Sequence, residues 1–149
     1  MSFVIKFRTA LIPYLPLVMR LGLGFVFLWS GLSKLGADTN ALGVCTNAAE
    51  AVSLVESFTW LPIEPELFVL VQSWLEVALG LMLMLGLWVE LAAFVSAVLF
   101  LLFFALLDFS YVWKNVGLLA LALATFAAAP DKWRLDIRFK VGGSGKVAA

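Results

Sequence analysis

The sequence predicts an all-α integral membrane protein, an antiparallel four-helix transmembrane bundle with a short interfacial helix in its first outer loop. Three observations predict this class. The 149-residue chain is 64% hydrophobic and 13% charged, with a mean hydropathy of +1.06, whereas soluble domains are typically about 25% charged. Four apolar stretches approach the roughly 20 residues that a helix needs to cross a bilayer. Basic residues gather at the two ends of the chain, as they do on the cytoplasmic side of membrane proteins.

The predicted spans lie near residues 14–34, 67–88, 91–107 and 111–129. The second and third connections are short, and short connections make consecutive helices antiparallel neighbours. The first connection is much longer and contains residues 47–58, whose apolar residues recur at helical spacing. Asn47 can cap this segment, so we expect a short helix on the outer membrane surface. Pro62 and Pro65 then mark the turn into span two.

A cleaved signal peptide is the alternative interpretation of the N-terminal stretch. Pro13, Pro16 and Arg20 interrupt this stretch, and no clear small-x-small cleavage site precedes Lys34. We therefore interpret the stretch as the first span rather than as a leader.

The two ends of the chain carry alternating apolar and charged residues, at 3–8 and at 133–140. This period of two is typical of strands, which could pair with each other or with a partner protein. The alternative is that each end lies on anionic lipid headgroups. We take residues 1–140 as a single transmembrane domain and residues 141–149 as a flexible, glycine-rich tail.

The distribution of basic residues predicts the orientation. An even number of spans places both termini on one side of the membrane. That side carries Lys6, Arg8, Lys132, Arg134, Arg138, Lys140 and Lys146. The other side has two lysines near span ends and is rich in acidic residues. The positive-inside rule therefore places both termini in the cytoplasm.

Spans one, two and four each carry polar residues and a glycine on one helix face, since steps of three and four share a face. The polar residues are Arg20 and Lys34 in span one, Gln72, Ser73 and Glu76 in span two, and Lys114 in span four. The glycines are Gly24, Gly31, Gly80 and Gly117. Glycine lets neighbouring backbones approach, and a charge in lipid is costly enough to face the bundle interior. We expect these faces to meet, with the glycines as close-packing positions.

Arg20 and Glu76 are the most informative of these residues. Arg20 lies roughly 20 Å from Lys34 along span one, and Glu76 lies roughly 12–15 Å into span two from the opposite side. We hypothesise that Arg20 reaches Glu76 and forms a buried pair, because a guanidinium matches the geometry of a carboxylate. The alternative is that Arg20 extends to the cytoplasmic interface. Glu76 is far from either surface and must be paired, hydrogen-bonded or protonated.

Lys34, Asp108 and Lys114 are predicted to gather at the outer face. One interpretation is that they extend to the interface beside Trp29 and Trp113. The other is a cationic rim that binds an anionic ligand or partner.

The composition excludes several kinds of site. The chain has no histidine and one cysteine, Cys45, so it lacks bis-histidine haem ligands, a CxxC pair and a cysteine set for an iron–sulfur cluster. We predict no metal site and no intrinsic cofactor. A serine nucleophile would lack a histidine base, and no phosphate-binding glycine loop is present. The net charge of zero gives no reason to expect nucleic acid as a partner.

The order and spacing of motifs resemble the DoxX family of four-span membrane proteins. The resemblance rests on RLGLGFVFLWSGLSKL in span one, LPIEPELFVLVQSWLEVALGLMLMLGLWVELAA around span two, and PDKWRLDI after span four. The matching residues are Arg20, Gly24, Gly31, Lys34, Glu76, Gly80, Gly86, Trp88, Leu135 and Asp136. Span three matches by hydrophobicity alone, and the first outer loop is longer than the family pattern.

The resemblance implies a bacterial or archaeal cytoplasmic membrane and a four-helix bundle. It also implies a link to thiosulfate:quinone oxidoreductase or terminal quinol oxidase complexes, and to sulfur-handling or detoxifying partner enzymes. We therefore expect a non-catalytic or accessory membrane subunit of a quinone-linked redox complex, with lipid and other subunits as partners. The alternatives are an oxidoreductase component that binds quinone or a sulfur substrate around Arg20 and Glu76, and a small-molecule transporter.

Overall fold

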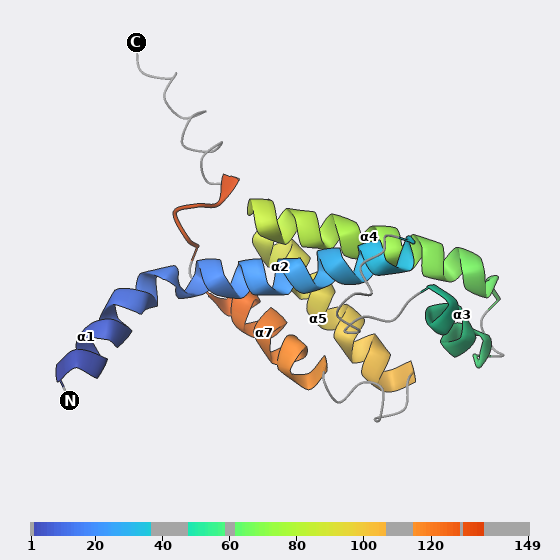
Figure 1. Ribbon diagram of the computed structural model, residues 1–149, viewed down its shortest axis with the longest axis horizontal. Helices are drawn as coiled ribbons and strands as arrows, with labels where there is room; N and C mark the ends of the chain where they lie inside the picture. The colour runs from blue at the N-terminus through green and yellow to red at the C-terminus, as the bar shows by residue number, and fades with distance from the viewer. Residues whose placement is uncertain (1, 37–47, 59–61, 107–114, 129, 136–149) are drawn as a thin grey trace, which may run out of the picture. The chain divides into compact units, whose positions relative to one another are not determined.

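The computed structural model describes residues 2–36, 48–58, 62–106, 115–128 and 130–135. These residues form helices and short turns, with no strand among them. In chain order the helices are α1 (Ser2–Leu11), the 3-10 helix η1 (Ile12–Tyr14), α2 (Leu15–Lys34), α3 (Ala48–Glu56), α4 (Pro65–Leu85), α5 (Val89–Leu106) and α7 (Asn115–Ala127) (Figure 1). The contacts divide the chain into two compact units. One unit is Gly24–Leu81, and the other joins Met1–Leu23 to Met82–Ala149.

The four predicted spans coincide with α2, α4, α5 and α7. Two helical stretches, Phe3–Lys34 and Pro65–Leu85, are long and apolar enough to cross a membrane, whereas Val89–Ala105 and Asn115–Ala127 are shorter apolar helices. The helical class is therefore confirmed, while a bundle of four complete crossings stays a prediction. The helix predicted within the first connection coincides with α3, and its place on the membrane surface stays a prediction. Its proposed cap Asn47 lies outside the described residues.

Local sequence explains where α4 begins and ends. Pro65 occupies its first position, where a missing N–H costs no hydrogen bond. At the other end Gly86 has a φ of +72°, and glycine adopts this left-handed conformation without steric cost. Gly86 N–H donates to the Leu83 carbonyl at 3.3 Å, and Leu87 N–H donates to the Met82 carbonyl at 2.8 Å. This Schellman pattern ends the helix and turns the chain toward α5.

The predicted strand at the N-terminus is wrong, because residues 2–11 form α1. A helix pairs its own backbone groups, whereas a strand needs a neighbouring strand. At the C-terminal side, residues 131–134 form a turn and Leu135 is helical. Residues 136–140 and the predicted tail at 141–149 lie outside the described residues.

In the unit that contains both chain ends, α5 packs against α7. Ala92 and Ala93 on α5 and Ala122 on α7 have no exposed surface. The rings of Phe94 and Phe126 lie 5.9 Å apart between centroids. Small side chains let the two helices approach closely, as expected for helices in a membrane.

In the unit Gly24–Leu81, two glycines bring α2 against α4. A Cβ atom built on Gly80 would lie 2.5 Å from the backbone nitrogen of Leu28 and 2.8 Å from the carbonyl oxygen of Gly24. A Cβ atom on Gly31 would lie 2.7 Å from the carbonyl oxygen of Ser73. These distances leave no space for a side chain, so the predicted close packing at Gly24, Gly31 and Gly80 agrees with the structure.

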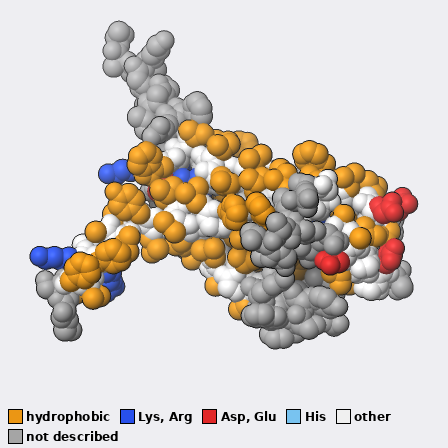
Figure 2. All heavy atoms as spheres, in the orientation of Figure 1, with side chains coloured by type: hydrophobic (Ala, Val, Ile, Leu, Met, Phe, Trp, Pro, Cys, Tyr) orange, Lys and Arg blue, Asp and Glu red, His pale blue; other side chains and the backbone are white. Residues whose placement is uncertain are grey.

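The same unit holds a small apolar cluster between α3 and α4. Ala51 and Val55 of α3 and Val69 of α4 form its buried centre. Elsewhere the surface is rich in large hydrophobic side chains, and Figure 2 shows a face on which they predominate. Trp74, for example, is 60% exposed on α4. Such surfaces are costly in water and are typical of proteins that contact lipid or other membrane helices.

Candidate functional site

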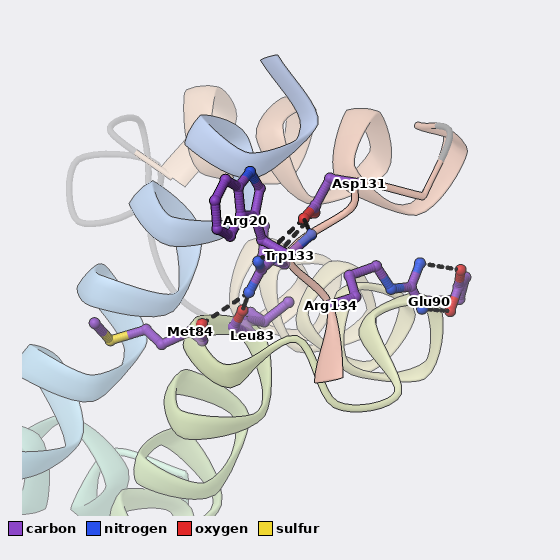
Figure 3. Close-up of polar contacts among 7 residues, drawn as sticks. All are labelled: Arg20, Leu83, Met84, Glu90, Asp131, Trp133 and Arg134. Carbon is purple, nitrogen blue, oxygen red and sulfur yellow. Dashed lines mark hydrogen bonds and ion pairs between the residues drawn. The ribbon is translucent and has the colours of Figure 1, made fainter. Parts of the chain in front are cut away.

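The first group of buried charges lies where α4 ends. We define the hairpin cluster as Arg20, Glu90, Asp131 and Arg134 (Figure 3). The Arg20 side chain is 2% exposed, and its Nε donates to Asp131 Oδ2 at 3.1 Å. A second nitrogen of the guanidinium, Nη2, lies 3.4 Å from Asp131 Oδ1. The planar guanidinium therefore faces a carboxylate with two of its nitrogens, which is the arrangement that suits arginine best.

The third nitrogen of Arg20 caps α4. Nη1 donates to the carbonyl oxygens of Leu83 and Met84, at 2.6 Å and 2.8 Å. Carbonyls in the last turn of a helix lack intrahelical partners and carry the negative end of the helix dipole. A buried cation at this position satisfies both, so Arg20 holds the end of α4 and Asp131 together.

Gly86 lets Arg20 reach these carbonyls. A Cβ atom on Gly86 would lie 3.0 Å from Arg20 Nη1 and 2.8 Å from the Cα atom of Arg134. Glycine is thus required here for its left-handed conformation and for the space above it.

The segment after α7 completes the hairpin cluster. Asp131 Oδ1 accepts a hydrogen bond from Trp133 N–H at 2.9 Å, which shapes an Asx-type turn. Arg134 donates from Nη1 and Nη2 to the two carboxylate oxygens of Glu90 at 2.5 Å and 2.6 Å. Arg134 is buried, whereas the Glu90 side chain is half exposed. Two arginine–carboxylate pairs therefore fasten residues 131–134 to α2 and to the first turn of α5.

The second group of buried charges lies in the unit Gly24–Leu81. We define the mid-helix cluster as Lys34, Gln72 and Glu76. Lys34 Nζ donates to both carboxylate oxygens of Glu76, at 2.6 Å and 2.8 Å. Gln72 Nε2, one turn away on α4, donates to Glu76 Oε1 at 3.1 Å. The side chains of Lys34 and Glu76 are 8% and 3% exposed, so the carboxylate is buried and surrounded by donors.

The hypothesis of a pair between Arg20 and Glu76 is wrong, because each has another partner. Arg20 bonds to Asp131 and Glu76 bonds to Lys34. The alternative in which Arg20 extends to the interface is also wrong, because its side chain is buried. The physical reason is depth: Arg20 is at the level of the end of α4, where carbonyls and Asp131 are available.

The predicted outer rim is wrong for Lys34, whose ammonium is buried against Glu76. Asp108 and Lys114 lie outside the described residues. Ser73 is buried as predicted, and its hydroxyl donates to the Val69 carbonyl one turn earlier at 2.6 Å. Within the described part of the chain Gly117 is not a close-packing position, because a Cβ atom there would meet none of the described atoms within 4 Å.

The sequence interpretation missed Asp131, Arg134 and Glu90. The alternating pattern was assigned to residues 133–140, so Asp131, which lies just before it, was given no role of its own. The available signal was the position of Asp131 directly after span four. In an antiparallel bundle, the end of span four lies on the same side of the membrane as the start of span one.

A hollow of about 580 Å³ lies beside Lys34 in the same unit. Its apolar lining includes Val52, Val69 and Leu70, and its charged lining includes Glu56 and Glu66. Among the residues that the structure describes, no group of three or more His, Cys, Asp and Glu side chains is placed to hold a metal ion.

A comparison with models of protein families matches residues 15–109 to the family described as DoxX. The matched range includes Arg20, Gly86 and the mid-helix cluster, and it ends before Asp131 and Arg134. No curated protein and no solved structure matches the chain.

Proposed function

The chain belongs to the DoxX family of membrane proteins, and on that premise we propose that it is a non-catalytic, accessory subunit of a quinone-linked redox complex in the cytoplasmic membrane. In this proposal α2, α4, α5 and α7 cross the bilayer and both termini lie in the cytoplasm. The link to redox complexes comes from the family resemblance of the sequence, and the structure supports the accessory role.

The observation that carries the proposal is the internal pairing of the buried charges. Arg20, Lys34 and Glu76 each bond to groups of the chain itself. Each pair costs desolvation energy that only good geometry repays, so opening it for a substrate would be costly. These groups therefore serve to hold the helices in register. In such a subunit the buried polar groups are not available to a substrate. The subunit instead acts through its surface, where large hydrophobic side chains can pack against lipid and neighbouring helices.

Purification of the full chain from its native membrane in mild detergent tests this function. We expect redox subunits to co-purify in stoichiometric amounts, identified by mass spectrometry. A chain that purifies alone and moves solute when reconstituted in vesicles would instead support a transporter. Recovery without redox subunits from native membrane discs, which keep the surrounding lipid, would contradict the accessory role.

The second candidate function is binding of quinone, and the hollow beside Lys34 favours it. A quinone ring could lie against Val52, Val69 and Leu70, and one of its carbonyl oxygens could accept a hydrogen bond from Lys34. Lys34 has three N–H groups, and the described contacts to Glu76 use two of them.

The Glu76→Gln variant separates these two functions. Glutamine preserves size and can still accept a hydrogen bond from Lys34, but it removes the charge. An accessory subunit should keep its complex and the turnover of that complex, provided that the variant folds. A quinone site should lose bound quinone, measured by extraction and chromatography. The exposed Glu64→Gln is the matched control, because Glu64 lies away from the mid-helix cluster on the surface.

A further inference from the structure

The helix α1 has an apolar surface that the described chain leaves uncovered. Large hydrophobic side chains on this helix are half to three-quarters exposed: Phe3 78%, Val4 68%, Ile5 58%, Phe7 58% and Leu11 48%. The rings of Phe3 and Phe7 stack on each other, with centroids 6.3 Å apart. Such a cluster of exposed side chains marks a surface that binds something apolar.

The residues of α1 are sorted around the helix axis. At about 100° per residue, Phe3, Val4, Phe7, Ala10 and Leu11 share one sector. Lys6 and Arg8 stand at the two borders of this sector, and Thr9 lies opposite. Ile5 is the exception on the polar side. Figure 2 shows hydrophobic side chains beside basic ones over α1.

Helix length places α1 at the membrane boundary. The 20 residues of α2 extend about 30 Å, which already matches the hydrocarbon thickness of a bilayer, about 30 Å. The 10 residues of α1 would therefore continue beyond the hydrocarbon. Pro13 lies in η1 between the two helices, and proline interrupts the helical hydrogen bonds. The chain bends at this point (Figure 1).

We propose that α1 lies flat in the cytoplasmic interface of the membrane and binds anionic lipid headgroups. Its apolar sector enters the boundary between headgroups and acyl chains, and Lys6 and Arg8 contact the negative headgroups on either side. Because Lys6 and Arg8 lie at the borders of the apolar sector, both side chains reach the level of the headgroups. This role is independent of the redox function, and its cytoplasmic side rests on the orientation proposed above.

The test uses the full chain in the Cys45→Ser background, with one new cysteine carrying an environment-sensitive fluorophore. In vesicles of phosphatidylcholine and phosphatidylglycerol, we expect a Phe7→Cys label to emit at shorter wavelength and to be quenched by spin-labelled lipid. A Thr9→Cys label on the polar side should be quenched by aqueous iodide instead. Equal accessibility of the two labels to iodide would overturn the proposal.

The charge requirement is tested separately. The Lys6→Gln/Arg8→Gln variant should lose the part of the Phe7 label's shift that depends on phosphatidylglycerol, and should behave like the parent in pure phosphatidylcholine. Lys132→Gln, at an exposed basic residue outside α1, is the matched control and should leave the shift unchanged. A shift that depends on the ratio of protein to lipid would contradict the proposal, because a second copy would then cover α1.

Discussion

Lys34 and Glu76 form an ion pair whose two side chains are almost fully buried. Removing one partner of a buried pair leaves a charge without compensation, which typically costs about 3–5 kcal/mol. Removing both can cost much less, because the desolvation penalty disappears together with the attraction. We therefore predict that the effects of substituting Lys34 and Glu76 on the free energy of unfolding are coupled.

We expect Lys34→Met to destabilise the protein by about 3–5 kcal/mol and Lys34→Met/Glu76→Gln to recover a large part of this loss. The free energy of unfolding, measured in mixed micelles with increasing SDS, gives the coupling through a double-mutant cycle. Gln72→Leu removes one hydrogen bond to the same carboxylate and serves as the milder comparison, with a loss of about 1 kcal/mol. Strictly additive losses for Lys34 and Glu76 would rule out the pairing.

Some properties of these single residues could be predicted from the sequence, and others could not. Burial of Glu76 was predicted, because a charge in the middle of an apolar helix has few alternatives, whereas burial of Arg20 was one of two alternatives, beside extension to the interface. Their partners were not, because pairing depends on the relative depth of helices, which a shift of one turn changes by about 5 Å. Asp131 was overlooked because it lies just beyond the last apolar stretch, where periodicity carries no information about a turn.

At the level of helices, hydropathy predicted the positions of α2, α4 and α5 well, and the helical spacing of apolar residues predicted α3. Helix ends were less predictable, since span two was expected to reach residue 88, whereas α4 ends at Leu85. The reason is Gly86, whose positive φ ends the helix before the apolar run is finished. Alternation failed at the N-terminus, because a short alternating segment does not decide between strand and helix, and the described residues offer it no partner strand.

The end of α4 at Gly86 can be tested by substitution. Gly86→Ala places a side chain in the left-handed region, at a cost of roughly 1–2 kcal/mol, and pushes its Cβ atom against Arg20 and Arg134. We expect a larger total loss of thermal stability, together with protease sensitivity of the segment after α7. Thermal unfolding in detergent and limited proteolysis measure the two effects.

Gly22→Ala is the matched control, because it lies in α2, has open space around it and has no positive φ. Alanine is the better helix former, by roughly 0.5–1 kcal/mol, so this variant should be neutral or slightly more stable. Similar losses in both variants would show that the Gly86 conformation is not the cause.

For the whole molecule, the proposed orientation predicts which side of the membrane each connection and terminus faces. Both termini should face the cytoplasm, and the connection between the first two spans should face outward. The chain carries a natural probe of that connection, since Cys45 is its sole cysteine.

In intact cells we expect a membrane-impermeant maleimide to label Cys45. In the Cys45→Ser background, a Ser144→Cys variant should react only after the membrane is permeabilised. Mass shifts on a gel measure both reactions. Labelling of position 144 in intact cells would contradict the predicted orientation.

The paired residues are separated by different lengths of chain, so the two ion pairs become available at different times during synthesis. Lys34 and Glu76 are 42 residues apart, whereas Arg20 and Asp131 are 111 apart. Ribosomes add about 5–20 residues per second, so the first pair becomes available several seconds before the second. Until Asp131 emerges, a nascent chain can offer the Arg20 guanidinium only the carbonyls at the end of α4. Assembly therefore begins with the mid-helix cluster, and the pair between Arg20 and Asp131 forms later.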